Sequence, residues 1–236
     1  MAAGRRPSVS LILPTYNEAS NLRCNFQNIY KIMKQFGDFE IIIAEDGSTD
    51  GSKEIARRLS LKSNVHLLSL DVRSGKGAAL KRGISAAKGD IIGYLDIDFA
   101  VPLRYVKTAV GMVEGGCDAV IGSRYSGTKV RRSMARLIAS KAYNLGVKMI
   151  TGSKFDDHQC GFKFWRSNLI KREAKAAEDN RWFFDAEVLL EAQRHNARIC
   201  VLPVQWEEHK ESKVRMYDPI YFISAMIRYR VNKGRV

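Results

Sequence analysis

The sequence predicts an α/β fold: a mostly parallel, Rossmann-like sheet with helices on both faces. Two observations predict it. Short apolar runs alternate along the chain with longer amphipathic segments, and polar residues cluster after each apolar run. Strict alternation of strand and helix gives a parallel sheet that helices cover on both faces. The polar residues then meet at the carboxyl edge of the sheet, where open α/β sheets bind ligands.

The first strands are predicted as short apolar runs at residues 9–13, 39–44, 65–70 and 91–95. Pro14 stops the first of them, and Asn17 or Ser20 is expected to cap the helix that follows at about 19–36. Further helices are predicted up to about residue 62 and over about 75–88.

The second half of the chain continues the pattern with longer helices. Its predicted strands span 118–122, 162–165 and 198–204, and its helices span about 103–114, 133–150, 184–196 and 219–231. The helix at 133–150 is amphipathic and unusually basic. No linker or internal repeat is visible, so residues 1–236 are expected to form a single domain that ends in an amphipathic helix.

The composition indicates a folded and strongly basic protein. Its 236 residues suit one large domain, and 39 Lys and Arg against 25 Asp and Glu give a formal net charge of +14. This excess indicates a partner such as nucleic acid, an anionic membrane surface or a phosphorylated substrate. The alternative is a solvated basic face with no special partner. Nucleic acid is not expected, because no helix-turn-helix, RNA-recognition or zinc-finger signature is present.

The cysteines and the N-terminus favour a cytoplasmic location. Cys24, Cys117, Cys160 and Cys200 form no C-x-x-C pair, so they are expected to be reduced and mostly buried thiols. The N-terminus has no apolar signal-peptide core, and no apolar run approaches the length of a bilayer span. The sequence therefore predicts a cytosolic protein or one bound peripherally to a membrane.

Asp96 and Asp98 follow the apolar strand 91–95 and are the first candidates for a functional site. Residues i and i+2 of an extended segment point the same way, so both carboxylates can converge on one point. Two such carboxylates repel each other unless a cation lies between them, and hard oxygen ligands favour Mg²⁺ or Mn²⁺. Magnesium shares its shell with substrate phosphates, which indicates a nucleoside diphosphate. The alternative is that both residues begin a solvated loop.

Lys76 and Asp46 are further candidates at the same edge. Lys76 lies between two glycines in a segment that matches neither a Walker A loop nor a full G-x-G-x-x-G fingerprint. Its charge and the free N–H groups of a helix N-terminus can bind a phosphate, and a surface lysine in a glycine-rich turn is the alternative. Asp46 is expected to be exposed after its strand and to accept from a nucleobase N–H. An Asx-turn role would suit Asp50 better.

Eight motifs occur in order along the chain: Pro14–Glu18, Glu45–Gly51, Gly75–Gly77, Asp96–Asp98, Gly122–Tyr125, Cys160–Lys163, Arg181–Glu187 and Glu211–Lys213. Together they resemble glycosyltransferase family 2, in the branch that holds dolichyl-phosphate mannose synthase and dolichyl-phosphate β-glucosyltransferase. The resemblance covers nearly the whole chain. Each motif is weak alone, and their common order makes the resemblance specific.

The resemblance implies a GT-A fold that transfers a sugar from a nucleotide donor to a polyprenyl phosphate, with inversion at the anomeric carbon. It implies that Pro14, Tyr16 and Glu18 line the nucleotide pocket. Asp46 would bind the base, and Asp96–Ile97–Asp98 would be the D-x-D motif, with Asp98 favoured over Asp96 as the direct metal ligand. The segments around Asp46, Lys76 and Trp182 are nearer the glucosyl branch and suggest UDP-glucose. The Asp-Ile-Asp-Phe-Ala segment departs from both branches and leaves GDP-mannose open.

A basic cradle is expected for the acceptor phosphate, because an anionic nucleophile needs cationic positioning more than a general base. Arg124 follows a strand at the same edge, and three residues recur every four positions on one helix face: Arg132, Arg136 and Ser140. Arg124 and Arg136 join Asp96 and Asp98 as catalytic candidates. A solvated basic helix face is the alternative. The loop with His209 and Lys213 is expected to close over the phosphates and exclude water.

Asp157 and the pair Asp185 and Glu187 carry the remaining expectations. Asp157 stands where other family 2 enzymes, acting on hydroxyl acceptors, carry their base; here it is expected to orient the sugar or the acceptor. A transferase that builds a polysaccharide would need Asp157 as its base. A nucleotide-sugar-binding subunit without turnover is a second alternative. Asp185 and Glu187 are expected to be structural supports.

The last predicted helix has apolar residues at helical spacing and basic residues at its end: Ile220, Ile223, Met226 and Ile227, then Arg228, Arg230, Lys233 and Arg235. Such a helix suits an anionic membrane surface, and a core helix with a frayed basic tail is the alternative. Many members of the resembled family continue into transmembrane helices. A membrane-anchoring partner subunit, this basic face, or a segment missing from the chain would therefore bring the protein to its lipid.

Overall fold

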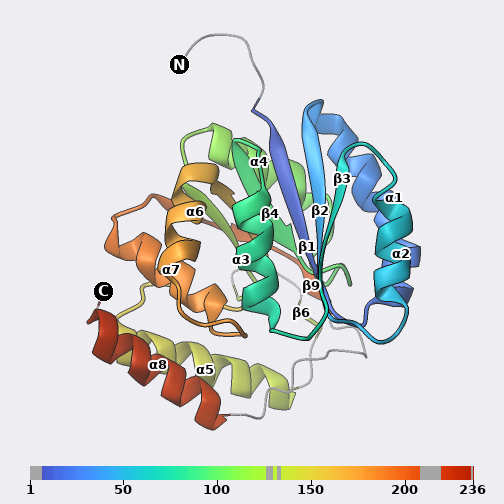
Figure 1. Ribbon diagram of the computed structural model, residues 1–236. Helices are drawn as coiled ribbons and strands as arrows, with labels where there is room; N and C mark the ends of the chain where they lie inside the picture. The colour runs from blue at the N-terminus through green and yellow to red at the C-terminus, as the bar shows by residue number, and fades with distance from the viewer. Residues whose placement is uncertain (1–6, 126–129, 132–133, 208–218, 235) are drawn as a thin grey trace.

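The computed structural model describes residues 7–125, 130–131, 134–207, 219–234 and 236. Its main feature is a seven-stranded sheet with the order β3-β2-β1-β4-β7-β5-β8 (Figure 1). The strands are β1 (Val9–Thr15), β2 (Phe39–Asp46), β3 (Val65–Leu70), β4 (Ile91–Leu95), β5 (Ala119–Ser123), β7 (Phe162–Arg166) and β8 (Ile199–Pro203). All pairings in this sheet are parallel except those of β7, which runs antiparallel to β4 and β5. Two short strands, β6 (Val130–Arg131) and β9 (Trp206–Glu207), pair separately.

Helices cover both faces of the sheet, as predicted. On one face lie α1 (Ala19–Met33), α2 (Ser52–Leu59) and α4 (Tyr105–Glu114), whose apolar sides join strand residues in one core cluster. On the other face lie α3 (Lys76–Ala86), α6 (Ser167–Ala176) and α7 (Phe184–Arg194), with a second core cluster. A short 3₁₀ helix, η1 (Lys34–Phe36), follows α1.

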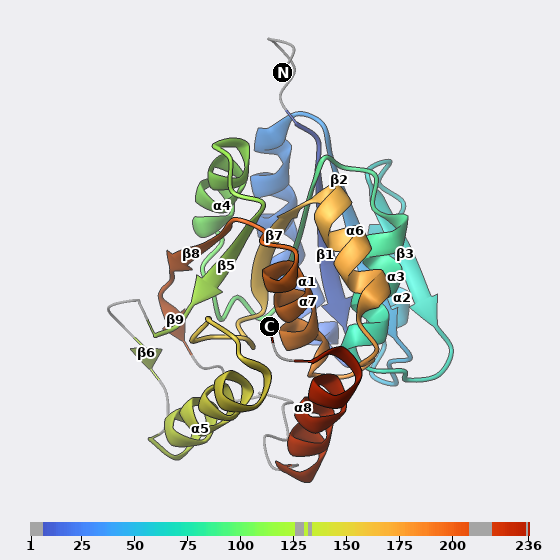
Figure 2. The same ribbon diagram turned by 90° about the vertical axis from the view of Figure 1, so that its left-hand side faces the viewer.

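Two helices lie outside these layers. Figures 1 and 2 show α5 (Met134–Thr151) and α8 (Pro219–Lys233) side by side, beyond the carboxyl ends of the parallel strands. Val147 of α5 and Phe222 of α8 share a third apolar cluster with Leu190 of α7. The pair therefore packs against α7, on the side of the molecule where the parallel strands have their carboxyl ends. In the described part of the chain, no helix combines the length and the apolarity that a bilayer crossing requires.

The predicted alternation of strands and helices is confirmed, and β3 and β4 have the predicted ends. Helix α6 was not predicted, and the antiparallel direction of β7 was not either. The predicted cap of α1 is wrong. Asn17 has a left-handed φ of 52°, and its Oδ1 accepts from the N–H of Thr49 at 2.8 Å. The start of α1 is held by Asp50, whose Oδ2 accepts from the N–H of Ala19 at 3.0 Å.

The expectation of reduced, mostly buried cysteines is also wrong. Cys117 and Cys200 form a disulfide although 83 positions separate them in the sequence. The pairing of β5 with β8 brings them together, because Val120 lies opposite Cys200 in the sheet. Of the other two, Cys24 is exposed and Cys160 is buried. Burial raises the pKa of Cys160 to about 12, so its thiol stays protonated and unreactive.

Candidate active site

The carboxyl ends of β1, β2 and β4 bring the predicted site residues to one edge of the sheet. Pro14 lies at the end of β1, with Tyr16 just beyond it, Asp46 ends β2, and Asp96 directly follows β4. These strands are neighbours because β1 pairs in parallel with both β2 and β4. The strand order therefore accounts for the clustering that the sequence predicted.

Asp96 and Lys76 form an ion pair at this edge. Nζ of Lys76 donates to Oδ1 of Asp96 at 2.8 Å. The Asp96 side chain is 42% exposed and that of Lys76 only 10%, so the carboxylate is open to a ligand while the lysine is largely enclosed. Gly161 makes room for this carboxylate, because a Cβ there would lie 1.9 Å from Oδ2 of Asp96. The Gly161 carbonyl also accepts from the Asp96 N–H at 3.1 Å.

A second, buried carboxylate shares Lys76. Oδ2 of Asp185 lies 3.7 Å from Nζ of Lys76, and Oδ1 of Asp185 accepts from Nζ of Lys163 at 2.7 Å. The hydroxyl of Tyr94 donates to the same Oδ1 at 2.8 Å. Burial alone would lower the pKa of Lys76, but attraction by Asp96 and Asp185 outweighs it and raises that pKa, so Lys76 stays charged. Burial would raise the pKa of Asp185, but Lys163 and Lys76 lower it, so this carboxylate stays ionised.

The prediction that Asp185 is a structural support agrees with this geometry, whereas Lys163 and Tyr94 were not predicted. The signal for Lys163 was present in the sequence. It is the one charged residue within the apolar run 162–165, and a charge in a buried strand requires a partner.

The first turn of α3 differs from the prediction. Its N–H groups were expected to be free for a phosphate, but the N–H of Gly77 donates to the Arg181 carbonyl at 3.1 Å and that of Ala78 to the Asn180 carbonyl at 2.9 Å. Trp182 of the same segment lies beside Lys76, with Nζ 5.4 Å from the ring centroid. Lys76 can therefore meet a phosphate through its ammonium group, but these two backbone groups are already used.

Asp46 is not exposed as predicted, since only 3% of the residue is accessible. Its two oxygens accept from the N–H groups of Ser74 at 2.7 Å and Gly75 at 2.8 Å. The carboxylate therefore fixes the loop that leads into Lys76. A carboxylate has further acceptor positions, so binding of a base by Asp46 stays a prediction.

Asp98 lies in a turn, not in the extended segment that was predicted. Strand β4 ends at Leu95, Phe99 has a left-handed φ of 57°, and Oδ1 of Asp98 accepts from the N–H of Ala100 at 3.1 Å. The side chains of Asp96 and Asp98 therefore do not converge through strand periodicity.

The residues at this edge still fit a divalent cation. Asp96 offers an open carboxylate that already holds one cation, the ammonium group of Lys76, and Asp98 acts on that same ammonium electrostatically. Carboxylate oxygens are the ligands that Mg²⁺ and Mn²⁺ prefer. The assignment of Asp96 and Asp98 as metal ligands remains a prediction.

The proposed nucleotide-pocket residues lie beside the turn after β2. The guanidinium of Arg73, which was not predicted, lies 4.0 Å from the ring centroid of Tyr16. The N–H of Glu18 donates to the Ser52 hydroxyl at 2.8 Å, and its Oε2 accepts from Nδ2 of Asn21 at 2.6 Å. These contacts join the end of β1 to the 45–52 turn, where a nucleotide pocket was expected.

Arg124 is buried against Asp157. Nε and Nη2 of Arg124 donate to the two Asp157 oxygens at 2.8 and 2.7 Å, and the Arg124 N–H donates at 2.9 Å. Burial would raise the pKa of Asp157, but Arg124 lowers it, so Asp157 stays ionised. Asp157 was expected to orient the sugar or the acceptor, whereas in the structure it binds Arg124. The guanidinium of Arg124 is also 5.7 Å from the ring centroid of Trp206.

The rest of the predicted acceptor cradle is described only in part. Ser140 lies buried in α5, where its hydroxyl bonds that of Tyr125. Arg136 belongs to α5, but its side chain lies outside the described part of the structure. Three further predicted residues lie outside the described residues altogether: Arg132, His209 and Lys213.

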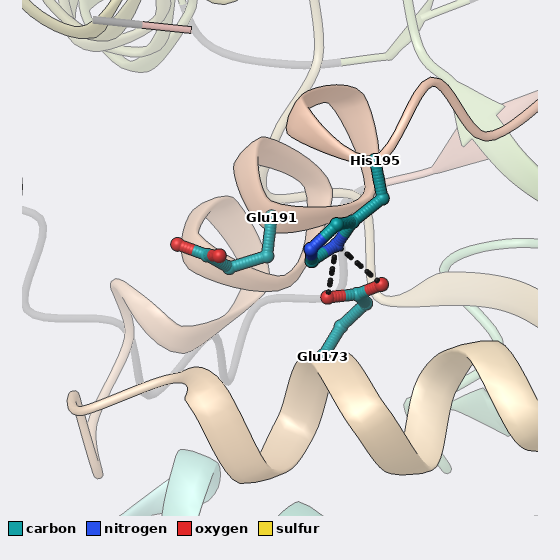
Figure 3. A group of neighbouring side chains, drawn as sticks. All are labelled: Glu173, Glu191 and His195. Atoms are coloured by element: carbon teal, nitrogen blue, oxygen red, sulfur yellow. Dashed lines mark hydrogen bonds and ion pairs between the residues drawn. The ribbon is translucent and has the colours of Figure 1, made fainter. Parts of the chain in front are cut away.

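A separate cluster of possible metal ligands lies between α6 and α7 (Figure 3). Nδ1 of His195 contacts the two Glu173 oxygens at 3.0 and 3.1 Å, and Glu191 lies nearby. Nη2 of Arg172 donates to Glu173 at 2.6 Å, and the Tyr229 hydroxyl donates to Glu191 at 3.0 Å. Both carboxylates therefore already have protein partners, and we assign this cluster to the packing of the two helices.

Comparisons of the sequence with known proteins identify a family that matches most of the chain. Residues 10–176 match the model of Glycosyl transferase family 2. The chain is 36% identical over 225 residues to glycosyltransferase AglD of Haloferax volcanii, covering 93% of this chain and 36% of AglD. It is 30% identical over 240 residues to the dolichyl-phosphate beta-glucosyltransferase of Dictyostelium discoideum, covering 94% of this chain and 73% of that protein. The chain thus spans about a third of AglD and about three quarters of the Dictyostelium protein.

Solved structures share the fold. Glucosyl-3-phosphoglycerate synthase from Mycobacterium tuberculosis, in complex with Mn²⁺, UDP and glucosyl-3-phosphoglycerate, aligns with a TM-score of 0.66 at 18% identity over 95% of this chain and 77% of that one. Mannosyltransferase PcManGT from Pyrobaculum calidifontis, in complex with GDP-Man and Mn²⁺, aligns with a TM-score of 0.62 at 21% identity over 88% of this chain and 59% of that one. The predicted GT-A fold is confirmed.

Proposed function

Because the chain belongs to glycosyl transferase family 2, we propose that it is an inverting hexosyltransferase that moves a sugar from a nucleotide donor to a polyprenyl phosphate such as dolichyl phosphate. The observation that carries the proposal is the position of the open Asp96 carboxylate with its Lys76 partner. Both lie at the carboxyl edge of the sheet, and α5 and α8 lie beyond the same edge (Figure 2). Relatives named dolichyl-phosphate beta-glucosyltransferase favour UDP-glucose as the donor, with GDP-mannose as the alternative.

In the proposed reaction, an oxygen of the lipid phosphate attacks the anomeric carbon of the sugar. The bond from that carbon to the diphosphate breaks on the opposite side, and the electron pair leaves with the nucleoside diphosphate. The nucleophile is already anionic, so no base has to remove a proton from it. The protein must instead hold the two anionic groups in line and stabilise the charge of the leaving diphosphate.

Lys76 fits the second task, since it is charged, enclosed and held by two carboxylates. A bound Mg²⁺ or Mn²⁺, held by Asp96 and Asp98, would supply further neutralisation of the diphosphate. Pro14, Tyr16, Glu18 and Asp46 would hold the nucleotide. The Ile97 carbonyl accepts from Nδ2 of Asn25 at 2.8 Å and so ties the D-x-D turn to α1; contact of Ile97 with the donor stays a prediction.

The lipid would approach over α5 and α8. Eight of the eleven large apolar side chains that are exposed in the described residues lie on these helices: Met134, Ile138, Leu145, Met149, Ile220, Ile223, Ile227 and Val231. Both helices contain basic residues and no acidic ones. An apolar face with a basic border favours the surface of an anionic membrane. We therefore propose peripheral attachment through this face; its position on the cytosolic side and a membrane-anchoring subunit stay predictions from the sequence.

The alternative of a saccharide hydroxyl as acceptor fits less well. It requires a general base, and Asp157 is the residue at the matching position. The Asp157 carboxylate is fully buried, and both its oxygens bind Arg124. An ionised carboxylate with a lowered pKa in such a pair is a poor proton acceptor. We propose instead that Asp157 holds Arg124 in place beside the acceptor site.

The test is a transfer assay with dolichyl phosphate, Mn²⁺ and, separately, radiolabelled UDP-glucose and GDP-mannose, with label counted in the organic phase. We expect label from one donor, and its loss in Asp98→Ala. Asp71→Ala removes an exposed carboxylate far from the D-x-D turn in sequence and serves as the matched control. If neither donor gives label in the organic phase when membranes are supplied, the lipid-phosphate acceptor is excluded. Donor binding without any transfer would favour the non-enzymatic subunit.

A further inference from the structure

The segment 177–183, between α6 and α7, forms one wall around Lys76. Its Asn180 and Arg181 carbonyls accept from the first N–H groups of α3, and the ring of Trp182 lies beside the Lys76 ammonium. There is no spare room between the segment and α3, since a Cβ on Gly75 would lie 2.4 Å from the Asn180 carbonyl oxygen. The position of this segment therefore determines where Lys76 lies.

Asp179 anchors this segment from both sides. Its N–H donates to Oε2 of Glu187 on α7 at 2.7 Å. Its side chain, 4% exposed, accepts from the N–H of Arg181 at 2.7 Å, which closes the segment into a turn. None of these contacts belongs to the core of the sheet. They fix the backbone that carries the carbonyls bound to α3.

Two side chains of helix α8 bind the Asp179 carboxylate. The Tyr221 hydroxyl donates to Oδ1 of Asp179 at 2.7 Å, and Nη2 of Arg228 donates to Oδ2 at 3.2 Å. The Tyr221 oxygen in turn accepts from the N–H groups of Trp182 and Phe183, each at 3.1 Å. A single hydroxyl of α8 thus bonds to three groups of the segment that encloses Lys76.

We propose that Asp179 is a positioning residue for the donor site, and that through Asp179 and Tyr221 the docking of α8 on a membrane sets the position of Lys76 against Asp96. The proposal deepens the proposed function and rests on it for the role of Lys76. Contacts run without a break from α8 to the D-x-D carboxylate: Tyr221 to Asp179, the segment 177–183 to α3, and Lys76 to Asp96. Attachment of α8 to lipid therefore orders the site that binds the sugar donor.

Tyr229 provides a matched control. It lies on the same helix, is largely buried, and its hydroxyl donates to a carboxylate of α7, Glu191, at 3.0 Å. Tyr229→Phe removes one hydrogen bond between α8 and α7, whereas Tyr221→Phe removes those to the segment 177–183. Only the second bears on Lys76.

The first measurement needs no enzymatic activity. The rate at which an amine-reactive reagent modifies Lys76 is followed by mass spectrometry, with and without anionic vesicles. Wild-type Lys76 is enclosed and ion-paired, so we expect slow modification that slows further with vesicles. In Tyr221→Phe and Asp179→Asn we expect modification about ten-fold faster and insensitive to vesicles, while Tyr229→Phe behaves as wild type. Equal rates in Tyr221→Phe and Tyr229→Phe would overturn the proposal, whether or not Asp179→Asn folds.

The second measurement separates this proposal from the proposed function. In the transfer assay, misplacement of Lys76 is expected to lower kcat/KM for the donor by about 10- to 100-fold in Tyr221→Phe, with an unchanged KM for the lipid. If wild type transfers no sugar but the Lys76 rates differ as expected, the proposed function fails and the positioning role holds. Normal donor kinetics in Tyr221→Phe would remove the positioning role and leave the proposed function standing.

Discussion

The ammonium group of Lys76 lies against Asp96, in the position where a bound cation would neutralise the same carboxylate. In the absence of a donor, Lys76 and a divalent cation would therefore compete for Asp96. Once the diphosphate of a donor is bound, its negative charge attracts both the Lys76 ammonium group and the metal ion, so the two no longer compete for Asp96 alone. Lys76 is thus expected to weaken metal binding by the free protein and to assist the sugar transfer.

The variant Lys76→Met separates these two effects. Removal of one charge-assisted hydrogen bond to the half-exposed Asp96 is expected to tighten Mn²⁺ binding without donor by about ten-fold, or about 1.4 kcal/mol. Transfer should fall about 100-fold, because a charge at the leaving diphosphate is lost. Electron paramagnetic resonance of free Mn²⁺ measures the first effect and the transfer assay the second. Weaker Mn²⁺ binding in the variant would contradict the competition.

His158 predicts a pH dependence of stability. Its Nδ1 donates to Oδ1 of Asn144 at 2.7 Å, and its Nε2 accepts from the Ser153 hydroxyl at 2.6 Å. One donating and one accepting ring nitrogen are the roles of a neutral imidazole. Burial lowers its pKa from 6.5 to about 4. Between those values the unfolded chain binds a proton that the folded chain does not, so the imidazole destabilises the fold as the pH falls from about 6.5 to about 4, by up to about 3 kcal/mol. The contribution is fully restored above about pH 6.5.

Urea unfolding at several pH values, for wild type and His158→Gln, measures this contribution as a difference between the two proteins. Wild type should lose stability relative to the variant below pH about 6.5. A constant difference across that range would show that His158 is not the titrating group. The difference is needed because Glu187, whose pKa burial raises to about 7, changes stability with the opposite sign.

The candidate site was predictable from the sequence in its members more than in its contacts. Asp46 ends β2, and Lys76 and Asp96 come after β3 and β4, which are parallel strands of the same sheet, so their common edge follows from the alternation of elements. Their hydrogen bonds do not. The Asp46 carboxylate accepts from the N–H groups of Ser74 and Gly75. Carbonyl groups of the segment after α6 accept from N–H groups in the first turn of α3. Each contact joins parts of the chain that no local pattern connects.

At the scale of elements, the packing of α3 against α7 depends on a residue without a side chain. A Cβ on Gly77 would lie 2.8 Å from Cβ of Phe184 and 2.8 Å from the carbonyl carbon of Asn180. Gly77→Ala is therefore expected to destabilise the fold by about 1–3 kcal/mol, because backbone and a buried ring must move. Gly111→Ala on α4 is the control, since nothing lies within 4 Å of its Cβ, and it should stabilise by up to about 1 kcal/mol. Chemical denaturation compares the two, and equal effects would contradict the packing.

The disulfide joins the segment after α4 to β8 at the end of the sheet. Cys200→Ala or reduction is expected to lower the free energy of unfolding by about 2–4 kcal/mol, because the bridge closes a long loop in the unfolded chain. Thermal unfolding with and without reductant measures it. Cys24→Ala changes an exposed thiol outside the bridge and should leave the reductant effect unchanged. Insensitivity of wild type to reductant would show that the bridge does not form in solution.

The strands of the fold were predicted closely, and the misses have physical reasons. A run of apolar residues identifies a buried strand but not its direction, so the antiparallel β7 looked like its neighbours. Helix α6 begins directly after β7 at Ser167, with no separating turn of glycine or proline to mark it. The pairing of Cys117 with Cys200 depends on the position of β8 beside β5, which strand order alone decides.

At the scale of the whole molecule, α5 and α8 lie on the same side as the carboxyl edge of the sheet (Figures 1 and 2), and both helices carry exposed apolar side chains. A polyprenyl phosphate keeps its chain in the bilayer and its phosphate at the surface. A protein that sits on this face would therefore present its donor site to the phosphate without extracting the lipid. Under the proposed attachment, the position of α5 and α8 would set both the orientation of the protein on the membrane and the access of the lipid phosphate to the site.

The last prediction tests that face. Leu145→Gln and Ile223→Gln each replace an exposed apolar side chain, on α5 and α8 respectively, and each should weaken binding to anionic vesicles by about ten-fold. Leu61→Gln changes a side chain at least as exposed that follows α2, away from this face, and should have no effect. Sedimentation with vesicles measures binding, which should also fall with rising salt because the basic residues of both helices contribute through a screened attraction. Unchanged binding in Leu145→Gln and Ile223→Gln, or equal binding to neutral and anionic vesicles, would exclude this face as the membrane contact.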